Sequence, residues 1–354
     1  MNAIPASRDT LPMLIIDYNP VEFPEKFGAA LARPNTLRCT WSDLVWSAIT
    51  VGRKHLQYVI RPETYAYFEL VHRATSLYAY WQAADYRPGL WGPADTHLRQ
   101  SPAYQHLGPA EKSANSYFLG LTAAKLFAEK LLNTPWLLHV DTYSRHIEAD
   151  LSWKLPDLVG LDRQLAWLVL EVKGRSNWLD QRVVKKAKQQ AQTLTRIAGC
   201  QPGLQVGFCS YFTGITKTFK VYLVDPPVKD KLGNGNNLDL TLETYLSAYY
   251  GLVFDTLTAE YGGESTAVTY RKHTYRVKSI AEADLQLGLD EQIYALLQSG
   301  DKSLSKNMAT GLSDVTSPSD EDEAQTTVGY DGIYVRLGDS WRDDKMYLSP
   351  AERR

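Results

Sequence analysis

The sequence is poor in cysteine and has no long hydrophobic run. Its 354 residues include three cysteines, Cys39, Cys200 and Cys209, and this odd number without a CxxC pair argues against a disulfide framework or a structural zinc site. No run of 18 apolar residues is present, and the N-terminus lacks the basic start and apolar core of a signal peptide. We therefore expect a soluble, cytoplasmic protein that does not contact membrane.

A charge excess of one sign is also missing. The chain has 38 basic and 40 acidic residues, unlike a protein that coats DNA constitutively. It contains no P-loop, GxSxG elbow, HExxH helix or GxGxxG loop after a strand, which argues against the corresponding nucleotide-binding, serine-hydrolase and zinc-protease sites. With 44% hydrophobic residues, the chain can bury a sizeable core and build two or three domains.

Two short apolar runs near the middle contain charged residues where apolar side chains are expected. The runs are Leu155–Val159 and Trp167–Lys173, and the turn-prone Asp162-Arg163-Gln164 between them predicts an antiparallel hairpin. Strand side chains alternate, so Glu171 and Lys173 share one face. A turn centred near Gln164 places Asp157 opposite or diagonal to Glu171, within about 5–8 Å at Cβ.

Three converging charges need compensation, because an unpaired charge buried in a strand costs several kcal/mol. Magnesium suits the site best, since it prefers carboxylate oxygens and keeps some of its waters. We expect Asp157 and Glu171 to bind Mg²⁺, or Mn²⁺ in its place, with the backbone carbonyl of Val172 as a further ligand. Lys173 is then expected to orient or deprotonate the attacking water, or to stabilise the charge developing on a phosphate.

This pattern resembles the PD-(D/E)xK superfamily of restriction-endonuclease-like nucleases. The order of expected elements is similar as well: a helix over 109–132, a strand over 136–141, the two motif strands, a helix over about 178–197, and strands over 204–211 and 218–224. The resemblance covers about residues 106–226 and implies an α/β (α+β) fold with a central mixed sheet flanked by helices.

Gln190 interrupts the apolar stripe of the helix that follows Lys173. The stripe comprises Val183, Ala187, Leu194 and Ile197, and a buried amide within it needs hydrogen-bond partners. Several branches of the superfamily have a glutamine that faces the metal from this helix, in a context like Ala187-Lys188-Gln189-Gln190-Ala191. A glutamine at the surface edge of a polar helix is the alternative.

Many members of the superfamily also have an acid on the first core helix. Glu111 and Glu129 are the two candidates here, and we prefer Glu111 because the first turn usually lies nearest the metal. Each has an ordinary alternative: Glu111 as a first-turn acid that favours the helix dipole, and Glu129 as an i,i+4 partner of Lys125. His139 and Asp141 share a strand face near the site and are interpreted as a polar pair.

Positive charge is concentrated around the motif. The basic residues expected to contact nucleic acid are Arg175, Arg182, Lys185, Lys186 and Lys188. A solvated helix face is the alternative for the three lysines. The resemblance implies a Mg²⁺-dependent endonuclease, with double-stranded DNA as the expected substrate, restriction or anti-phage defence as the setting, and a homodimer or a defence-system protein as partner. A silent nuclease fold that serves as a binding platform, and an RNA or repair nuclease, stay open.

The remaining sequence divides by composition. We expect a mostly helical, aromatic-rich accessory region over 1–105, the nuclease core over 106–228, and a mixed region over 229–300. An acidic segment rich in Ser and Thr over 301–327 has the composition of a disordered linker, and a strand-like segment over 328–354 follows it.

Overall fold

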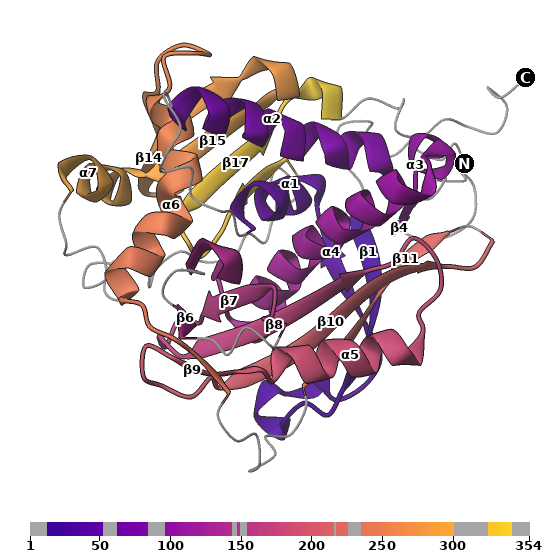
Figure 1. Ribbon diagram of the computed structural model, residues 1–354. Helices are drawn as coiled ribbons and strands as arrows, with labels where there is room; N and C mark the ends of the chain where they lie inside the picture. The colour runs from indigo at the N-terminus through magenta and orange to yellow at the C-terminus, as the bar shows by residue number, and fades with distance from the viewer. Residues whose placement is uncertain are drawn as a thin grey trace, which may run out of the picture.

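The computed structural model describes residues 13–51, 62–83, 96–143, 147–148, 154–215, 217–225, 235–300 and 325–341. It is a mixed α/β structure with a curled central sheet flanked by helices (Figure 1). No helix within these ranges combines the length and the apolar character needed to cross a membrane. The acidic residues from Asp314 to Glu323, which belong to the expected linker over 301–327, lie outside the described residues.

The described residues form a nine-stranded central sheet with parallel and antiparallel pairs. Its strand order is β2-β1-β4-β11-β10-β8-β7-β5, with β3 paired to β4. The motif strands β7 and β8 are antiparallel neighbours, as the sequence predicts, whereas β8 and β10 run parallel. The strands are β1 (Leu14–Val21), β2 (Asn35–Cys39), β3 (Trp81–Ala83), β4 (Thr96–Gln100), β5 (Trp136–His139), β7 (Leu158–Leu161), β8 (Trp167–Gly174), β10 (Leu204–Thr213) and β11 (Thr218–Val224).

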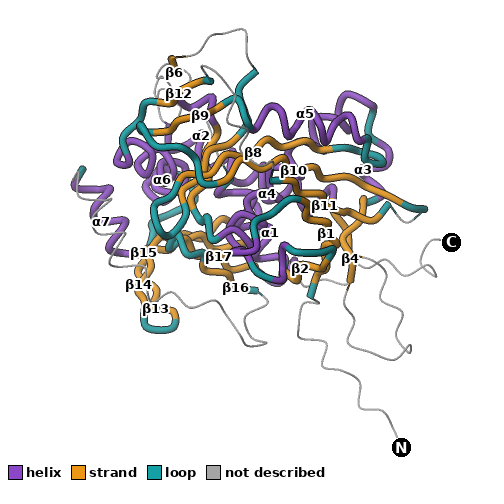
Figure 2. Tube along the Cα trace, turned by 90° about the horizontal axis from the view of Figure 1, so that it is seen from below, coloured by secondary structure: helices purple, strands orange, loops and turns teal. Residues whose placement is uncertain are grey.

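Helices α4 (Pro109–Leu132) and α5 (Gln181–Ala191) cover opposite faces of this sheet (Figures 1 and 2). Phe208 of β10 packs against Phe127 of α4, with ring centroids 5.6 Å apart. The next residue, Cys209, packs with Val184 of α5 on the other face. This alternation follows from the two-residue period of a strand, and it places the β8 residues that neighbour Cys209 beneath α5.

The bounds of α4 agree with the sequence prediction. Pro109 is its first residue, the Glu111 carboxylate accepts from the Gly108 N–H, and Asn133 ends the helix in the left-handed conformation at φ 53°. The helix passes very close to the end of β8, because a Cβ on Gly174 would lie 1.9 Å from the Ser116 carbonyl oxygen. Glycine at 174 therefore permits α4 to approach the motif strand.

The expectation of a mostly helical region over 1–105 is wrong in one respect. Helices α1 (Trp41–Thr50) and α2 (Pro62–Tyr80) are present, but the same region also supplies β1 to β4 to the central sheet. Leu14, Ile16 and Tyr18 of β1 are buried at alternate positions, a strand pattern that the density of aromatic residues concealed. The N-terminal region is thus part of the central sheet.

Three further boundaries differ from the prediction. Helix α5 ends at Ala191, and Leu194–Ile197 forms strand β9, which pairs with β12 (Asn236–Leu238). The β-branched Thr193, Thr195 and Ile197 favour this extended conformation. Thr326–Val328 forms β16 although the expected linker reached residue 327. The strand expected over 136–141 ends at His139, where a 3-10 turn begins.

A third layer lies beyond α4 on the side away from α5. In both views α1 separates α4 from a C-terminal sheet of order β13-β14-β15-β17-β16 (Figures 1 and 2). A small sheet, β6-β12-β9, completes the described strands. The remaining elements are α3 (Pro102–His106), β6 (Ile147–Glu148), α6 (Leu242–Thr258), β13 (Thr266–Tyr270), β14 (His273–Ile280), β15 (Leu285–Asp290), α7 (Glu291–Ser299) and β17 (Ile333–Leu337).

Candidate functional site

The register of the β7–β8 hairpin brings Asp157 and Glu171 together. Leu158 of β7 pairs with Leu170 of β8, so Asp157, which directly precedes β7, lies at the level of Glu171. The two strands also bind each other's carboxylates: the Asp157 N–H donates to Glu171 Oε2 at 3.1 Å, and the Val172 N–H donates to Asp157 Oδ2 at 2.8 Å. The predicted convergence of the two acids is therefore present in the structure.

Lys173 and Gln190 complete the side of the site beneath α5. The Lys173 ammonium forms an ion pair with Glu171 Oε1 and lies 3.3 Å from Gln190 Oε1. The Gln190 amide nitrogen donates to the Leu155 carbonyl oxygen at 2.6 Å. Gln190 is buried and points inward, so the surface-edge alternative for this residue does not hold.

The other side of the site is formed by α4 and β5. The Tyr117 hydroxyl donates to Asp157 Oδ1 at 2.9 Å and lies 3.1 Å from His139 Nε2. The sequence analysis places His139 near the site but does not name Tyr117. A tyrosine hydroxyl at a core-facing helix position needs a hydrogen-bond partner, and this need is the signal that could have linked Tyr117 to an acid on a neighbouring strand.

Burial dominates the electrostatics of this site. Glu171 is fully buried, and burial followed by repulsion from Asp157 raises its pKa to about 8, although Lys173 opposes the shift. Burial also lowers the pKa of His139, which the nearby Asp157 partly offsets. The same burial, reinforced by Asp157, raises the pKa of Tyr117, so its hydroxyl keeps its hydrogen. Two facing carboxylates in this environment repel each other and would gain from a cation between them.

The donor set fits a hard divalent cation. Val172 uses its N–H to bind Asp157, and the carbonyl of the same strand residue points toward the same edge, so Val172 remains a suitable backbone ligand. Among the described residues, no group of three or more His, Cys, Asp or Glu is placed to hold a metal. Two carboxylates are still enough for Mg²⁺, which is commonly bound by one or two carboxylates and several waters.

Glu111 is not part of this arrangement. Its carboxylate caps its own helix through the Gly108 N–H at 2.9 Å, and its side chain is exposed. The ordinary alternative, a first-turn acid, is therefore its observed role, and the expectation that Glu111 belongs to the catalytic set is wrong. The residue of α4 that reaches the site is Tyr117, nearly two turns further along.

The expected nucleic-acid contacts divide into two groups. Arg182, Lys185 and Lys186 are exposed on α5, as the expectation requires. Lys188 instead forms an ion pair with Glu22, and Arg175 is half-buried where β8 ends, with its backbone N–H donating to Ser210. The basic surface near the site therefore centres on the first two turns of α5.

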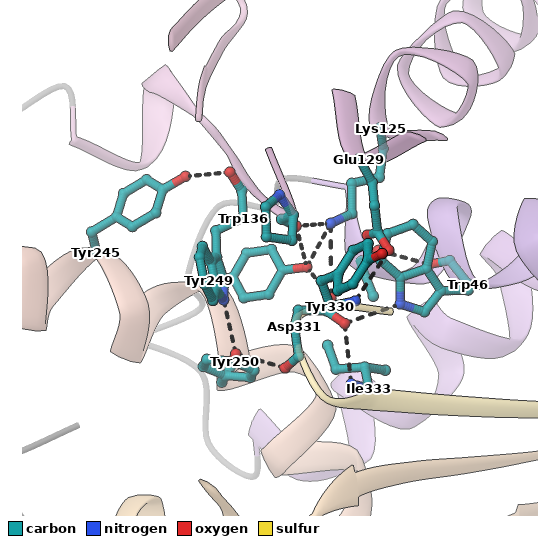
Figure 3. A network of polar contacts seen from close by, with 12 residues as sticks. Trp46, Lys125, Glu129, Trp136, Tyr245, Tyr249, Tyr250, Tyr330, Asp331 and Ile333 are labelled. Carbon is teal, nitrogen blue, oxygen red and sulfur yellow. Dashed lines mark hydrogen bonds and ion pairs between the residues drawn. The ribbon is translucent and has the colours of Figure 1, made fainter. Parts of the chain in front are cut away.

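A second polar cluster is entirely enclosed by protein (Figure 3). Lys125 of α4 donates to the Pro135 carbonyl and to the Tyr249 hydroxyl, and it lies 3.8 Å from Asp331. Glu129 accepts from the Tyr330 N–H at 3.1 Å. This closed cluster, Lys125, Glu129 and Asp331, joins α4 to the turn between β16 and β17, so Lys125 and Glu129 are more than the helix-surface pair that the sequence suggested.

No protein-family model, curated protein or solved structure matches the chain.

Proposed function

We propose that the protein is a divalent-metal-dependent nuclease whose site is formed by Asp157, Glu171, Lys173 and Gln190. The observation that carries the proposal is that two carboxylates meet at the start of β7, each accepting from a backbone N–H of the other segment, with an ammonium group held beside them. Two carboxylates that face each other destabilise the strands that carry them, so folding alone does not account for these residues. Binding of a cation accounts for their presence better.

The residues divide the chemistry among them. Asp157, Glu171 and the Val172 carbonyl would hold Mg²⁺ or Mn²⁺, which when bound supplies activation of a water and stabilisation of the leaving oxygen. Lys173 is a compact cation whose position is fixed by Glu171 and Gln190, so it can bind a phosphate oxygen or orient the attacking water. Gln190 also ties α5 to Leu155, next to the start of the motif.

The proposal also includes a fold and a substrate class. Apart from the additional short strands β6 and β9, the order α4, β5, β7, β8, α5, β10, β11 is the one that the resemblance to PD-(D/E)xK nucleases leads us to expect. On that resemblance we propose a restriction-endonuclease-like core, DNA as the substrate, and restriction or anti-phage defence as the setting. The exposed Arg182, Lys185 and Lys186 supply the positive charge that phosphate binding requires.

A binding platform is the second candidate function. The ion pair between Lys173 and Glu171 already compensates one carboxylate, which is the arrangement expected of a site that works without metal. Such a protein would bind nucleic acid through α5 and would not cleave it.

Cleavage in the presence and absence of metal decides between the two functions. We expect purified protein to cut plasmid DNA with Mg²⁺ or Mn²⁺ and to stop with EDTA, with RNA tested in parallel. Asp157→Asn, Glu171→Gln and Lys173→Met should each lower the rate by about 1000-fold or more, because a lost contribution of several kcal/mol corresponds to that factor.

Asp162→Asn is the matched control for this experiment. Asp162 lies in the turn of the same hairpin, where its carboxylate accepts from the Gln164 and Ala166 N–H groups, and an asparagine oxygen can accept both bonds. This variant should cleave like the wild type. DNA binding that is unaffected by metal, without cleavage of DNA or RNA, would favour the platform.

A further inference from the structure

Tyr117 and His139 lie on two elements that run side by side. Helix α4 ends at Leu132, and the chain returns along it as β5, which ends at His139. Both side chains reach the end of the sheet where β7 begins, and their rings are 6.4 Å apart at an interplanar angle of 70°. The close approach of Ser116 to Gly174 fixes the helix at this level. Tyr117 is therefore placed by the backbone packing of its own helix.

The hydrogen bonds of these residues have only one consistent direction. The Tyr117 hydroxyl donates its single hydrogen to Asp157 Oδ1 at 2.9 Å. His139 Nε2 lies 3.1 Å from the same hydroxyl oxygen and must then donate to it. The chain accordingly runs from His139 Nε2–H to the Tyr117 hydroxyl and on to Asp157.

This chain determines how Asp157 is held. Oδ1 accepts from Tyr117 and Oδ2 accepts from the Val172 N–H, so two bonds from different elements fix the plane of the carboxylate. Each oxygen retains a further lone pair for a cation. A carboxylate held in this way loses little freedom when it binds metal, which is the role that hydrogen-bond partners of metal ligands commonly have.

We propose that Tyr117 and His139 are positioning residues for the metal ligand Asp157, and this inference rests on the proposed function. Tyr117 acts on Asp157 directly, and His139 acts by fixing the direction of the Tyr117 hydroxyl. Neither residue is required to exchange a proton with substrate.

Metal affinity is the first measurement. Mn²⁺ binding to the full chain, followed by calorimetry, should weaken by about 10–100-fold in Tyr117→Phe, the usual effect of removing a partner of a metal ligand. His139→Leu should weaken binding less than Tyr117→Phe, and His139→Gln should restore it, because the glutamine amide nitrogen can replace the Nε2 donor.

Tyr245→Phe is the matched control. Its hydroxyl is also buried and lies 3.0 Å from two carbonyl oxygens, that of Trp136 in β5 and that of Val159 in β7, between which it shares its single hydrogen. The Tyr245→Phe variant therefore removes a tyrosine hydroxyl that contacts β5 and β7 but does not contact Asp157. Mn²⁺ affinity should be unchanged in this variant. Equal affinities for Tyr117→Phe and the wild type would overturn the positioning role.

Nitrogen NMR of His139 in metal-free protein provides an independent measurement. The proposal requires a hydrogen on Nε2 in the wild type and a changed Nε2 signal in Tyr117→Phe. A bare Nε2 in the wild type would overturn the chain whatever the metal affinity. If the NMR result is as expected but wild-type protein binds no Mn²⁺, the hydrogen-bond chain stands, and the positioning of a metal ligand fails together with the proposed nuclease.

Discussion

Helix α4 contacts two clusters of charged side chains, and the clusters differ in how their charges are satisfied. One is the candidate site of Asp157, Glu171, Lys173 and Gln190, called the open site below, and the other is the closed cluster. Tyr117 and Lys125 are eight residues apart, a rise of about 12 Å along the helix. On the segment that contains β5, Pro135 and His139 are four residues apart, about 13 Å along an extended chain. Tyr117 and His139 therefore mark the open site at one end of this pair of elements, and Lys125 and Pro135 mark the closed cluster at the other.

In the closed cluster, Lys125 and Asp331 are satisfied within the protein. Both are completely buried, and Asp331 accepts from the Trp46 indole at 3.3 Å, the Ile333 N–H at 3.1 Å and the Tyr249 hydroxyl at 2.5 Å. The Lys125 ammonium also lies 4.2 Å from the centroid of the Trp46 ring. These contacts fix the turn before β17 against α4 and α1.

The open site uses its charges differently. Two acids face each other there, and the balancing lysine side chain keeps 24% of its surface exposed. Solvent can therefore reach the group that would meet a phosphate. The comparison shows that burial of charge alone does not indicate a ligand-binding site. Two acids placed together beside a solvent-accessible lysine are a better indication of such a site.

The largest effect should come from breaking the closed cluster. Asp331→Ala removes the counter-charge of Lys125 and three hydrogen bonds, and the loss of one partner of a buried pair typically costs about 3–5 kcal/mol. Unfolding in urea measures this change. Lys188→Ala, which breaks the partly exposed pair with Glu22, is the control and should cost about 1 kcal/mol or less. Similar losses in the two variants would mean that the cluster does not hold the C-terminal sheet.

Sequence reasoning reached the open site more completely than the closed cluster. Asp157, Glu171, Lys173 and Gln190 are close in the chain, so strand alternation and turn chemistry were enough to place them. Asp331 and Lys125 are 206 residues apart, and no local pattern indicates that they meet. The sheet strands of the N-terminal region were missed for a related reason, since the partners of β1 are β2, β4 and the distant β11. Helix bounds followed local signals and were predicted where caps were strong, as in α4.

Metal should stabilise the open site by an intermediate amount. A ligand that binds only the folded state at a free concentration 100 times its Kd raises the free energy of unfolding by about 2.7 kcal/mol. We expect this increase with Mn²⁺ in the wild type and its loss after chelation or in Asp157→Asn. Asp331→Ala should retain the increase as long as it folds, because the two clusters share no side chain. An unchanged melting temperature with Mn²⁺ would contradict the metal site.

The last comparison concerns the pH dependence of the closed cluster. Burial, followed by repulsion from Asp331, raises the pKa of Glu129 to about 8, and its Oε2 atom has no hydrogen-bond partner among the described residues. The folded protein therefore binds a proton that the unfolded chain releases near pH 4.5. Its contribution to stability is complete below that pH and is lost as the pH rises toward 8, at about 1.4 kcal/mol per pH unit. Because Glu129 and Asp331 interact, the change belongs to the cluster as a whole.

Glu129→Gln tests this dependence, because its amide resembles the protonated acid but cannot ionise. The wild type also contains Glu171, whose pKa is raised in the same direction, so the quantity to measure is the difference in unfolding free energy between variant and wild type at each pH. Urea unfolding between pH 5 and pH 8.5 should show this difference growing in favour of the variant as the pH rises. A difference that does not change with pH would mean that Glu129 is ionised in the folded protein, and the closed cluster would then hold two negative charges against the single ammonium of Lys125.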